Sequence, residues 1–156
     1  MLELKNILIP VDFSAFSKYA LKYGAVLARL FDARILILHV ISQEWLDEMK
    51  AVQYFGGAID SPEELLARKK SYVAEMIEKM IKEEIDETSL EDKLIVVGVP
   101  ADEIIRLAEE REIDLIIVGT HGRSGLSKVF LGSVAQRVAR RAPCSVLCVR
   151  EKRTDK

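Results

Sequence analysis

The sequence predicts an α/β protein: one open, doubly wound sheet of five parallel strands with helices on both faces. Three observations support this fold class. The chain has 156 residues, the size of one compact domain, so residues 1–156 are expected to form a single domain. Hydrophobic residues make up 49% of the chain and aromatic residues only 6%, and such an aliphatic core favours buried parallel strands. Apolar runs alternate with amphipathic segments, as in consecutive β-α-β units.

The first part of the chain contains two apolar runs separated by an amphipathic segment. Residues 5–11, "KNILIPV", predict the first strand, and residues 33–41, "ARILILHVI", predict the second. Between them, residues 14–32 predict a helix with Ser14 as its N-cap. The apolar residues that recur at helical spacing, and so mark its buried side, are Phe16, Ala20, Tyr23, Leu27 and Leu30.

Residues 43–61 show no clear helix or strand pattern. They contain Trp45, Tyr54, Phe55 and a pair of adjacent glycines. A long segment of this kind is either a lid over a pocket or a loop packed over the edge of the sheet, and the sequence leaves both interpretations open.

The rest of the chain repeats the alternation of helix and strand. A long helix starts after Ser61, where a capping residue precedes a proline at the first helical position. Its buried side is marked by Leu66, Val73, Ile77, Met80 and Ile81. The remaining elements are a strand over 93–98, a helix over 100–112, a strand over 113–119, a helix over 133–142 and a strand over 144–150. Right-handed crossovers leave few topologies for this βαβαβαβαβ order, and we expect the strand order 3-2-1-4-5.

The charge balance argues against a nucleic-acid partner. Lys and Arg total 23 and Asp and Glu total 25, which gives a formal net charge of −2, whereas a nucleic-acid binder usually carries a basic excess. Arg137, Arg140 and Arg141 form a local basic cluster. Their place near the end of a predicted helix is explained by the helix dipole.

The sequence shows no targeting or membrane segment. The start, "MLELKNILIPVD", lacks the pattern of a signal peptide, and no apolar run has the length of a membrane span. We therefore expect a soluble, cytoplasmic protein with no membrane partner. Cys144 and Cys148 lie four residues apart on one predicted strand, so they share a face and are interpreted as small buried hydrophobic residues in a reducing compartment.

The connection between the fourth strand and the last helix is about twice as long as an ordinary strand-to-helix connection. The stretch over 116–139 contains four glycines and no acidic residue. Gly119, Gly122 and Gly125 are predicted to take positive φ and to present backbone N–H groups to a ligand. The last helix opens at Gly132-Ser133 with further free N–H groups and its positive dipole end. Side chains that favour an anion such as a phosphate chain are Arg123, Lys128 and Ser133.

The predicted topology places this connection at a binding crevice. Ligands of open α/β sheets bind beyond the carboxyl ends of the strands, where the strand order reverses. With strands one and four as neighbours, "IPVD" after the first strand faces the glycine-rich connection. The connection is not a Walker loop, since no G-x-x-x-x-G-K-[ST] string occurs, and it is not a dinucleotide fingerprint, which would follow the first strand.

The glycine spacing resembles a known family pattern. The pattern resembles the G-2x-G-9x-G-[ST] signature of the ATP-binding branch of the universal stress protein family. It consists of Gly119, two residues, Gly122, nine residues and then Gly132-Ser133. "ILIPVDFS" and "APCSVLCV" also resemble that family's pattern, and the resemblance covers essentially the whole chain. It implies a fold like that of the adenine nucleotide alpha hydrolases, and binding of ATP together with Mg²⁺ or Mn²⁺.

The resemblance also implies which residues hold the nucleotide. Asp12 would lie near the ribose and would bind the divalent ion directly or through water, and Val40 would hold the adenine edge through its backbone. The ribose and phosphates would lie against Gly119 to Arg123 and Gly132 to Val134. The full set of predicted nucleotide-binding residues is Pro10, Val11, Asp12, Val40, Gly119, Thr120, His121, Gly122, Arg123, Ser124, Gly125, Gly132, Ser133 and Val134. No catalytic residue is predicted.

Three polar residues also have simpler interpretations. Asp12 could serve only as a cap of the first helix, because Asp is a common capping residue. His39 lies inside a predicted strand, where packing alone explains it. His121 either touches ribose or phosphate or faces water.

The residues favour a binding module over an efficient enzyme. Efficient phosphoryl transfer requires a positioned base, tightly held metal and a charge-stabilising arginine, and the sequence offers one acid, Asp12, and one loop arginine, Arg123. The predicted function is therefore that of an ATP-binding universal stress protein acting as a nucleotide-dependent switch or sensor in the stress response. The alternative is a slow ATP-hydrolysing enzyme, a weak ATPase or a nucleotidyl or phosphoryl transferase. A flavin or electron-transfer role has the wrong loop pattern.

The last strand predicts how the chain assembles. Residues 144–150, "CSVLCVR", form an apolar strand at the end of the sheet, and an exposed apolar edge invites pairing with another chain. Two copies related by a two-fold axis would pair this strand antiparallel, as is common in the resembled family. We expect a homodimer through Cys144 to Arg150, the alternative being a monomer whose edge is covered by the polar tail.

Overall fold

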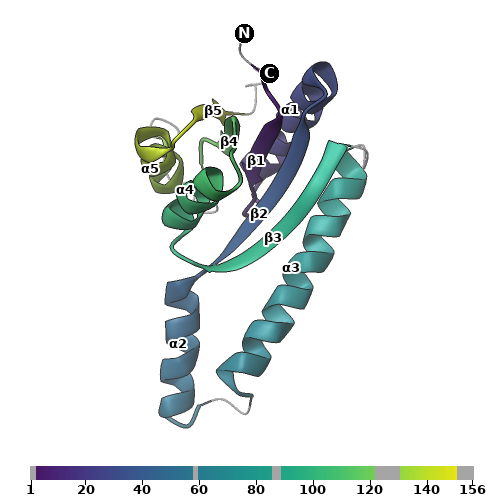
Figure 1. Ribbon diagram of the computed structural model, residues 1–156. Helices are drawn as coiled ribbons and strands as arrows, with labels where there is room; N and C mark the ends of the chain where they lie inside the picture. The colour runs from purple at the N-terminus through teal and green to yellow at the C-terminus, as the bar shows by residue number, and fades with distance from the viewer. Residues whose placement is uncertain (1–2, 58–59, 86–88, 122–130, 151–156) are drawn as a thin grey trace, which may run out of the picture.

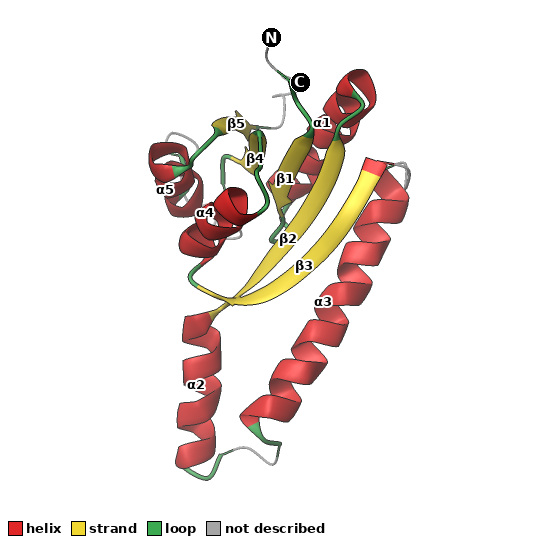
Figure 2. Ribbon diagram, viewed as in Figure 1, coloured by secondary structure: helices red, strands yellow, loops and turns green. Residues whose placement is uncertain are grey.

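The computed structural model describes residues 3–57, 60–85, 89–121 and 131–150. The strands in this part of the chain form one parallel sheet in the order β3-β2-β1-β4-β5, which confirms the predicted fold class and strand order. Figure 1 follows the chain along this sheet, and Figure 2 separates strands from helices. The elements are β1 (Asn6–Pro10), α1 (Ala15–Phe31), β2 (Arg34–Ser42), α2 (Gln43–Tyr54), α3 (Pro62–Glu84), β3 (Leu90–Gly98), α4 (Pro100–Glu110), β4 (Leu115–Gly119), α5 (Ser133–Arg141) and β5 (Ser145–Val149).

The helices cover both faces of the sheet, as predicted. Ile7 and Ile9 of β1 face a cluster built with α1 and α3, and Leu8 between them faces a second cluster built with α4 and α5. All three side chains are fully buried. Each such side chain contributes about 1.5–3 kcal/mol of transfer free energy, so the two clusters hold the layers together. No helix in the described part of the chain is long and apolar enough to cross a membrane.

The predicted capping residues are confirmed where the structure describes them. Ser14 has extended backbone angles, and its side chain accepts a hydrogen bond from the backbone N–H of Ser17 at the start of α1. Ser61 and Glu64 form a complete capping box at the start of α3. The hydrogen bonds from Ser61 hold the pKa of the Glu64 carboxyl below its usual value.

The buried side of α1 differs from the prediction. Tyr23 and Leu30 are 40% and 71% exposed, whereas the sequence pattern placed both in the core. The residues that α1 does bury are Ser17, Ala20, Leu21, Gly24 and Ala28. Most of them are small because α1 lies close to the sheet: a Cβ added to Gly24 would lie 2.2 Å from Cδ1 of Ile9. For α3 the prediction is confirmed at Val73, Ile77, Met80 and Ile81, while Leu66 is only partly buried.

The expectation that residues 43–61 have no regular structure is wrong. Residues 43–54 form helix α2, whose N-cap Ser42 accepts a hydrogen bond from the backbone N–H of Trp45. Figure 2 shows α2 beside the first half of α3, beyond the ends of β2 and β3. Lys69 of α3 lies over the Trp45 ring, with 5.1 Å between Nζ and the ring centroid. No residue of α2 is buried, so this helix is held by α3 more than by the core.

Candidate functional site

A cavity of about 390 Å³ opens at the carboxyl ends of β1, β2 and β4. The strand order reverses between β1 and β4, so the cavity lies where open α/β sheets bind their ligands. Its size is that of a small-molecule pocket. The described residues that line it are Pro10, Val11, Asp12, Ser17, Leu38, His39, Val40, Pro100, Ile104, Val118, Gly119, His121, Gly132, Ser133, Val134 and Ala135. None of these comes from residues 43–61, so the described part of that segment is not in the cavity wall.

Nine of the predicted nucleotide-binding residues line this one cavity. They are Pro10, Val11, Asp12, Val40, Gly119, His121, Gly132, Ser133 and Val134. Thr120 is 3% exposed and lies behind the wall. Gly122, Arg123, Ser124 and Gly125 lie outside the described residues, as does Lys128. The sequence analysis did not place Ser17, Pro100 or Ile104 at the site. Pro100 could have been found, because it begins a helix directly after the carboxyl end of a strand.

The turn from β1 into α1 holds Asp12 at the cavity wall. The Asp12 carboxylate accepts a hydrogen bond from the backbone N–H of Ser14 at 3.0 Å, and the Asp12 N–H donates to Ser17 Oγ at 3.3 Å. Phe13 between them takes a φ of 66°, in the left-handed region that non-glycine residues seldom adopt. The N-cap of α1 is Ser14, so Asp12 supports the cap from the residue two positions earlier while it also faces the cavity.

His39 is buried, as its position in a strand predicted, but it also lines the cavity. Its Nδ1 lies 2.7 Å from the carbonyl oxygen of Val11, and its ring lies 4.9 Å from the ring of Phe13. The Nδ1 contact ties β2 to the end of β1. His39 therefore fixes the backbone of the turn that presents Asp12.

The start of α5 presents the positive end of a helix to the cavity. Its N-cap is Gly132, which provides no side-chain hydrogen bond, and its first turn contains no acidic residue. The last turn carries Arg140 and Arg141, which complement the opposite end of the dipole. At the start of α5, beside the cavity, the backbone N–H groups thus have no capping side chain among the described residues. Such an arrangement suits an anion.

The ends of the glycine-rich connection are tied together at the cavity wall. The backbone N–H of Gly132 donates to the carbonyl oxygen of Thr120 at 2.7 Å, and the N–H of Thr120 donates to the carbonyl of Val149 at 2.9 Å. The two ends of the connection therefore lie next to each other, one following β4 and the other preceding α5. These two hydrogen bonds place the start of α5 beside the end of β4.

Gly119 has a different reason to be glycine from the one predicted. We expected it to take a positive φ, but among the described glycines only Gly56 does so. A Cβ added to Gly119 would instead lie 2.7 Å from Cβ and 2.8 Å from the carbonyl carbon of Phe16. Gly119 is required because β4 ends against the backbone of α1.

His121 contributes a ring to the wall next to Gly119. Its Nδ1 lies 3.0 Å from Oγ1 of Thr120, and its ring centroid lies 5.1 Å from that of Phe16. Its Nε2 is buried and has no hydrogen-bond partner in the described part of the protein.

The site offers little for a metal by itself. The described residues contain no group of three or more His, Cys, Asp or Glu side chains that could hold a metal ion. Asp12 is the one carboxylate among the described lining residues. A divalent ion at this cavity would therefore take most of its ligands from a bound phosphate chain and water.

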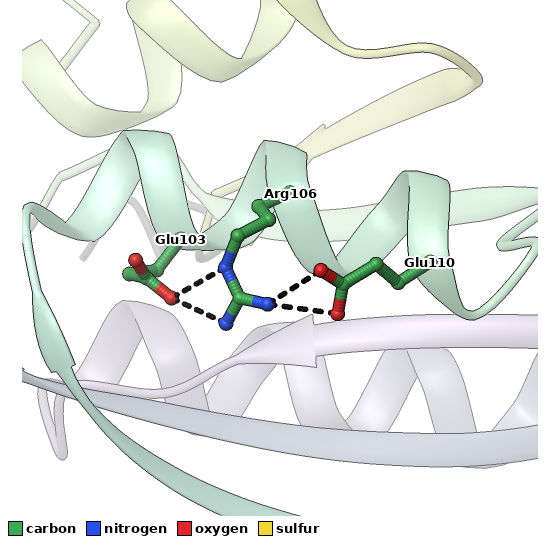
Figure 3. Close-up of polar contacts among 3 residues, drawn as sticks. All are labelled: Glu103, Arg106 and Glu110. Carbon is green, nitrogen blue, oxygen red and sulfur yellow. Dashed lines mark hydrogen bonds and ion pairs between the residues drawn. The ribbon is translucent and has the colours of Figure 1, made fainter.

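Charged residues outside the cavity support the helix that forms one of its walls. Figure 3 shows Arg106 of α4 between Glu103 and Glu110, with hydrogen bonds of 2.6–3.0 Å to the two carboxylates. Hydrogen bonds to Glu103 first, and then to Glu110, raise the pKa of the Arg106 guanidinium above its usual value. The Asp102 carboxylate on the same helix lies 3.2 Å from guanidinium nitrogens of both Arg137 and Arg141, so much of the basic cluster on α5 is engaged with α4.

The two cysteines are less buried than predicted. Cys144, just before β5, and Cys148, within β5, are both partly exposed at this edge of the sheet, and neither forms a disulfide. Their partial burial raises the pKa of each thiol, which favours the neutral form.

Comparison with known proteins identifies the family. The family model of the universal stress protein family matches residues 3–150. The universal stress protein MJ0577 of Methanocaldococcus jannaschii is 32% identical over 155 residues, which cover 95% of this chain and 96% of that protein. Universal stress protein YxiE of Bacillus subtilis is 32% identical over 149 residues, which cover 93% and 98%.

Solved structures agree with the sequence relatives. The structure of MJ0577 matches with a TM-score of 0.81 and covers 98% of this chain and 100% of that chain. A universal stress protein solved in complex with cAMP, 23% identical, shares the fold with a TM-score of 0.64 over 96% of this chain and 98% of that chain. The family match over nearly the whole chain, together with relatives of the same length, shows that this chain belongs to the universal stress protein family.

Proposed function

We propose that this chain binds ATP or a related adenine nucleotide in the cavity and acts as a nucleotide-dependent switch or sensor in the stress response. The observation that carries the proposal is the pairing of an apolar wall with an uncapped helix start in one cavity. Val40, Ile104 and Val118 provide apolar surface for a base, and the start of α5 provides N–H groups for phosphate. The reported complex of a protein of this fold with cAMP is consistent with a nucleotide ligand.

The proposed contacts follow the cavity. The adenine edge meets the backbone of Val40, the ribose lies near Asp12, and the phosphates lie at Gly132 to Val134. Gly122 to Gly125 are proposed to add phosphate contacts, on the basis of the sequence alone. Mg²⁺ or Mn²⁺ is proposed to bridge Asp12 and the phosphates, directly or through water.

We favour a binding protein over an efficient enzyme. Among the described lining residues there is a single carboxylate, Asp12, and no Lys or Arg side chain. Efficient phosphoryl transfer needs a positioned base, a held metal and a charge-stabilising arginine. Slow ATP hydrolysis is the alternative function. Single-turnover hydrolysis of bound ATP separates the two, because a switch holds ATP intact over many minutes.

Calorimetric titration with ATP, ADP and AMP tests the proposal. We expect a dissociation constant in the low micromolar range, about −8 kcal/mol, since base burial and several phosphate hydrogen bonds outweigh the cost of association. Gly132→Val places a branched side chain at the cavity wall and should weaken ATP binding about tenfold or more. Ala139→Val, on an exposed position of α5, is the matched control and should bind as the parent does. Absence of binding heat for all three nucleotides at millimolar concentration would refute the function.

The proposed assembly is a homodimer through residues 144–150, which contain β5, in the cytoplasm. β5 is an edge of the sheet, and its Val146, Leu147 and Cys148 side chains are only partly buried. A second copy pairing antiparallel across a two-fold axis would cover this edge. No nucleic-acid or membrane partner is proposed.

A further inference from the structure

Helix α1 has a second apolar side, which the packing of the core does not use. Its inner side buries mostly small residues against the sheet. On the outer side, Tyr23 is 40% exposed, Val26 57% and Leu30 71%, and Tyr19 is partly exposed. The outer stripe of α1 is defined here as Tyr19, Tyr23, Val26 and Leu30. None of the four is among the described residues that line the cavity.

The outer stripe is one continuous surface. Its members follow one another at intervals of four, three and four residues, which places them in line along one side of the helix. The ring centroids of Tyr19 and Tyr23 lie 5.8 Å apart. Single exposed apolar side chains are normal on soluble proteins, whereas contiguous apolar patches mark interaction surfaces.

The spacing of the outer stripe favours another helix as its partner. Alternating steps of three and four residues are those of the a and d positions of a heptad, where the side chains of one helix fit between those of another. The stripe runs over about 16 Å of α1, which matches a short amphipathic helix. A lipid surface makes no use of such spacing, because lipid tails do not interlock with a row of side chains.

The exposed flank of the outer stripe is basic. Lys18, Lys22 and Arg29 lie along the same side of it at helical spacing. Lys22 Nζ lies 3.8 Å from a carboxylate oxygen of Glu84. Lys18 and Arg29 take part in none of the ion pairs among the described residues. A partner with acidic side chains beside its own apolar side complements this flank.

The same charges disfavour a second copy of this chain. Two α1 helices packed antiparallel across a two-fold axis have their basic flanks on the same side, so that like charges meet. A parallel pair places each basic flank beside the apolar side chains of Ala20 and Leu27, which offer no acidic group.

We propose that the outer stripe of α1 is a docking surface for an amphipathic helix of a partner protein that carries acidic residues beside its apolar side. One helix against one helix buries little area, and interfaces of small area are weak and transient. The proposal does not depend on the nucleotide function.

Two designed peptides test this surface on the full-length protein. Each contains three heptads with leucine at a and d, and one carries glutamate at e and g where the other carries lysine. The like charges keep each peptide from pairing with itself. In fluorescence anisotropy we expect the glutamate peptide to bind with a Kd of about 10–100 μM, and the lysine peptide to bind at least about tenfold more weakly.

Variants of exposed residues locate the binding on α1. Val26→Ser combined with Leu30→Ser removes half of the outer stripe and should weaken binding of the glutamate peptide about tenfold or more. Tyr72→Ser is the matched control, because Tyr72 is a 60% exposed aromatic residue of α3 outside the stripe, and it should leave binding unchanged. Lys18→Glu combined with Arg29→Glu should reverse the preference, so that the lysine peptide binds better.

Four results overturn the proposal. The first is that the parent protein binds neither peptide or binds both equally. The second is that binding of the glutamate peptide survives the double serine change. The third is a lower oligomer mass of the double serine variant in sedimentation, which assigns the stripe to a second copy. The fourth is that the parent binds phosphatidylserine vesicles and the double serine variant does not, which assigns the stripe to a membrane.

Discussion

Replacing Gly119 with alanine tests the close approach of β4 to α1. The new Cβ would lie 2.7 Å from Cβ, 2.8 Å from the carbonyl carbon and 3.0 Å from the carbonyl oxygen of Phe16. Carbon atoms in contact prefer about 3.5–4.0 Å, so the helix or the strand must move by roughly 1 Å. Two of the three clashing atoms are backbone, which cannot rotate away. Overpacking of this kind costs about 1–3 kcal/mol, and we expect about 3 kcal/mol here.

The test is the free energy of unfolding, measured by urea denaturation, of Gly119→Ala compared with that of the control variant Gly98→Ala. Gly98 also ends a parallel strand, but a Cβ there would meet only the flexible side chain of Glu103, which can swing aside at the small cost of its surface ion pair with Arg106. Gly98→Ala should stay within about 1 kcal/mol of the parent, since alanine is also the better residue in a strand. In a domain of this size the Gly119→Ala cost corresponds to a fall in Tm of about 10 °C. Equal stability of the two variants would refute the argument from backbone contact.

Three further predictions address the site, the assembly and pH. Asp12→Ala should weaken ATP binding more with Mg²⁺ than without it in calorimetry, and equal losses would leave Asp12 as a support of the helix cap only. Val146→Pro removes a backbone donor from β5 and should shift the protein from dimer to monomer in light scattering while ATP binding persists; a dimer that survives the change would place the interface elsewhere. Glu64 has a lowered pKa in the folded state, so the stability it contributes is present above the ordinary carboxyl value of 4.5 and is lost as pH falls through the lower folded value. The difference in Tm between the parent and Glu64→Gln should therefore shrink from pH 6 to pH 3, and a constant difference would count against a lowered pKa of Glu64 in the folded protein.

Much of the fold was predictable because its signals are local. A strand buried on both faces reads as a continuous apolar run, and a helix start needs a side-chain acceptor for its free N–H groups. Both signals are carried by a few adjacent residues, as at Ser14 and Ser61. The strand order followed, because right-handed crossovers leave few ways to arrange five parallel strands.

The candidate site was predictable only in part. The glycine spacing and the helix start at Gly132 indicated the side of the cavity that is proposed to hold phosphate, since backbone N–H groups at a helix start need no distant partner. Pro100 shares the signal of a helix that starts right after a strand, but Ile104 carries no local signal. They reach the cavity because α4 packs beside α5 across the sheet.

Helix α2 escaped prediction because its signal is weak by comparison. It has an N-cap at Ser42 but buries none of its residues, so it lacks the strong apolar stripe that marks a helix packed on a core. Its contact with α3, including Lys69 over Trp45, is formed by residues far apart in sequence.

The sequence by itself determined the order of the strands and of the described helices other than α2, and the caps at Ser14 and Ser61, in this universal stress protein. The tertiary structure alone decided which side of α1 is buried, why Gly119 must lack a side chain, and that a buried nitrogen of His121 has no hydrogen-bond partner among the described residues. The reason is that periodicity in a sequence reports how apolar a residue is. The spacing between a helix and the sheet limits the size of the side chains that fit between them. That spacing depends on how all the layers of the protein pack together, which no local sequence pattern reports.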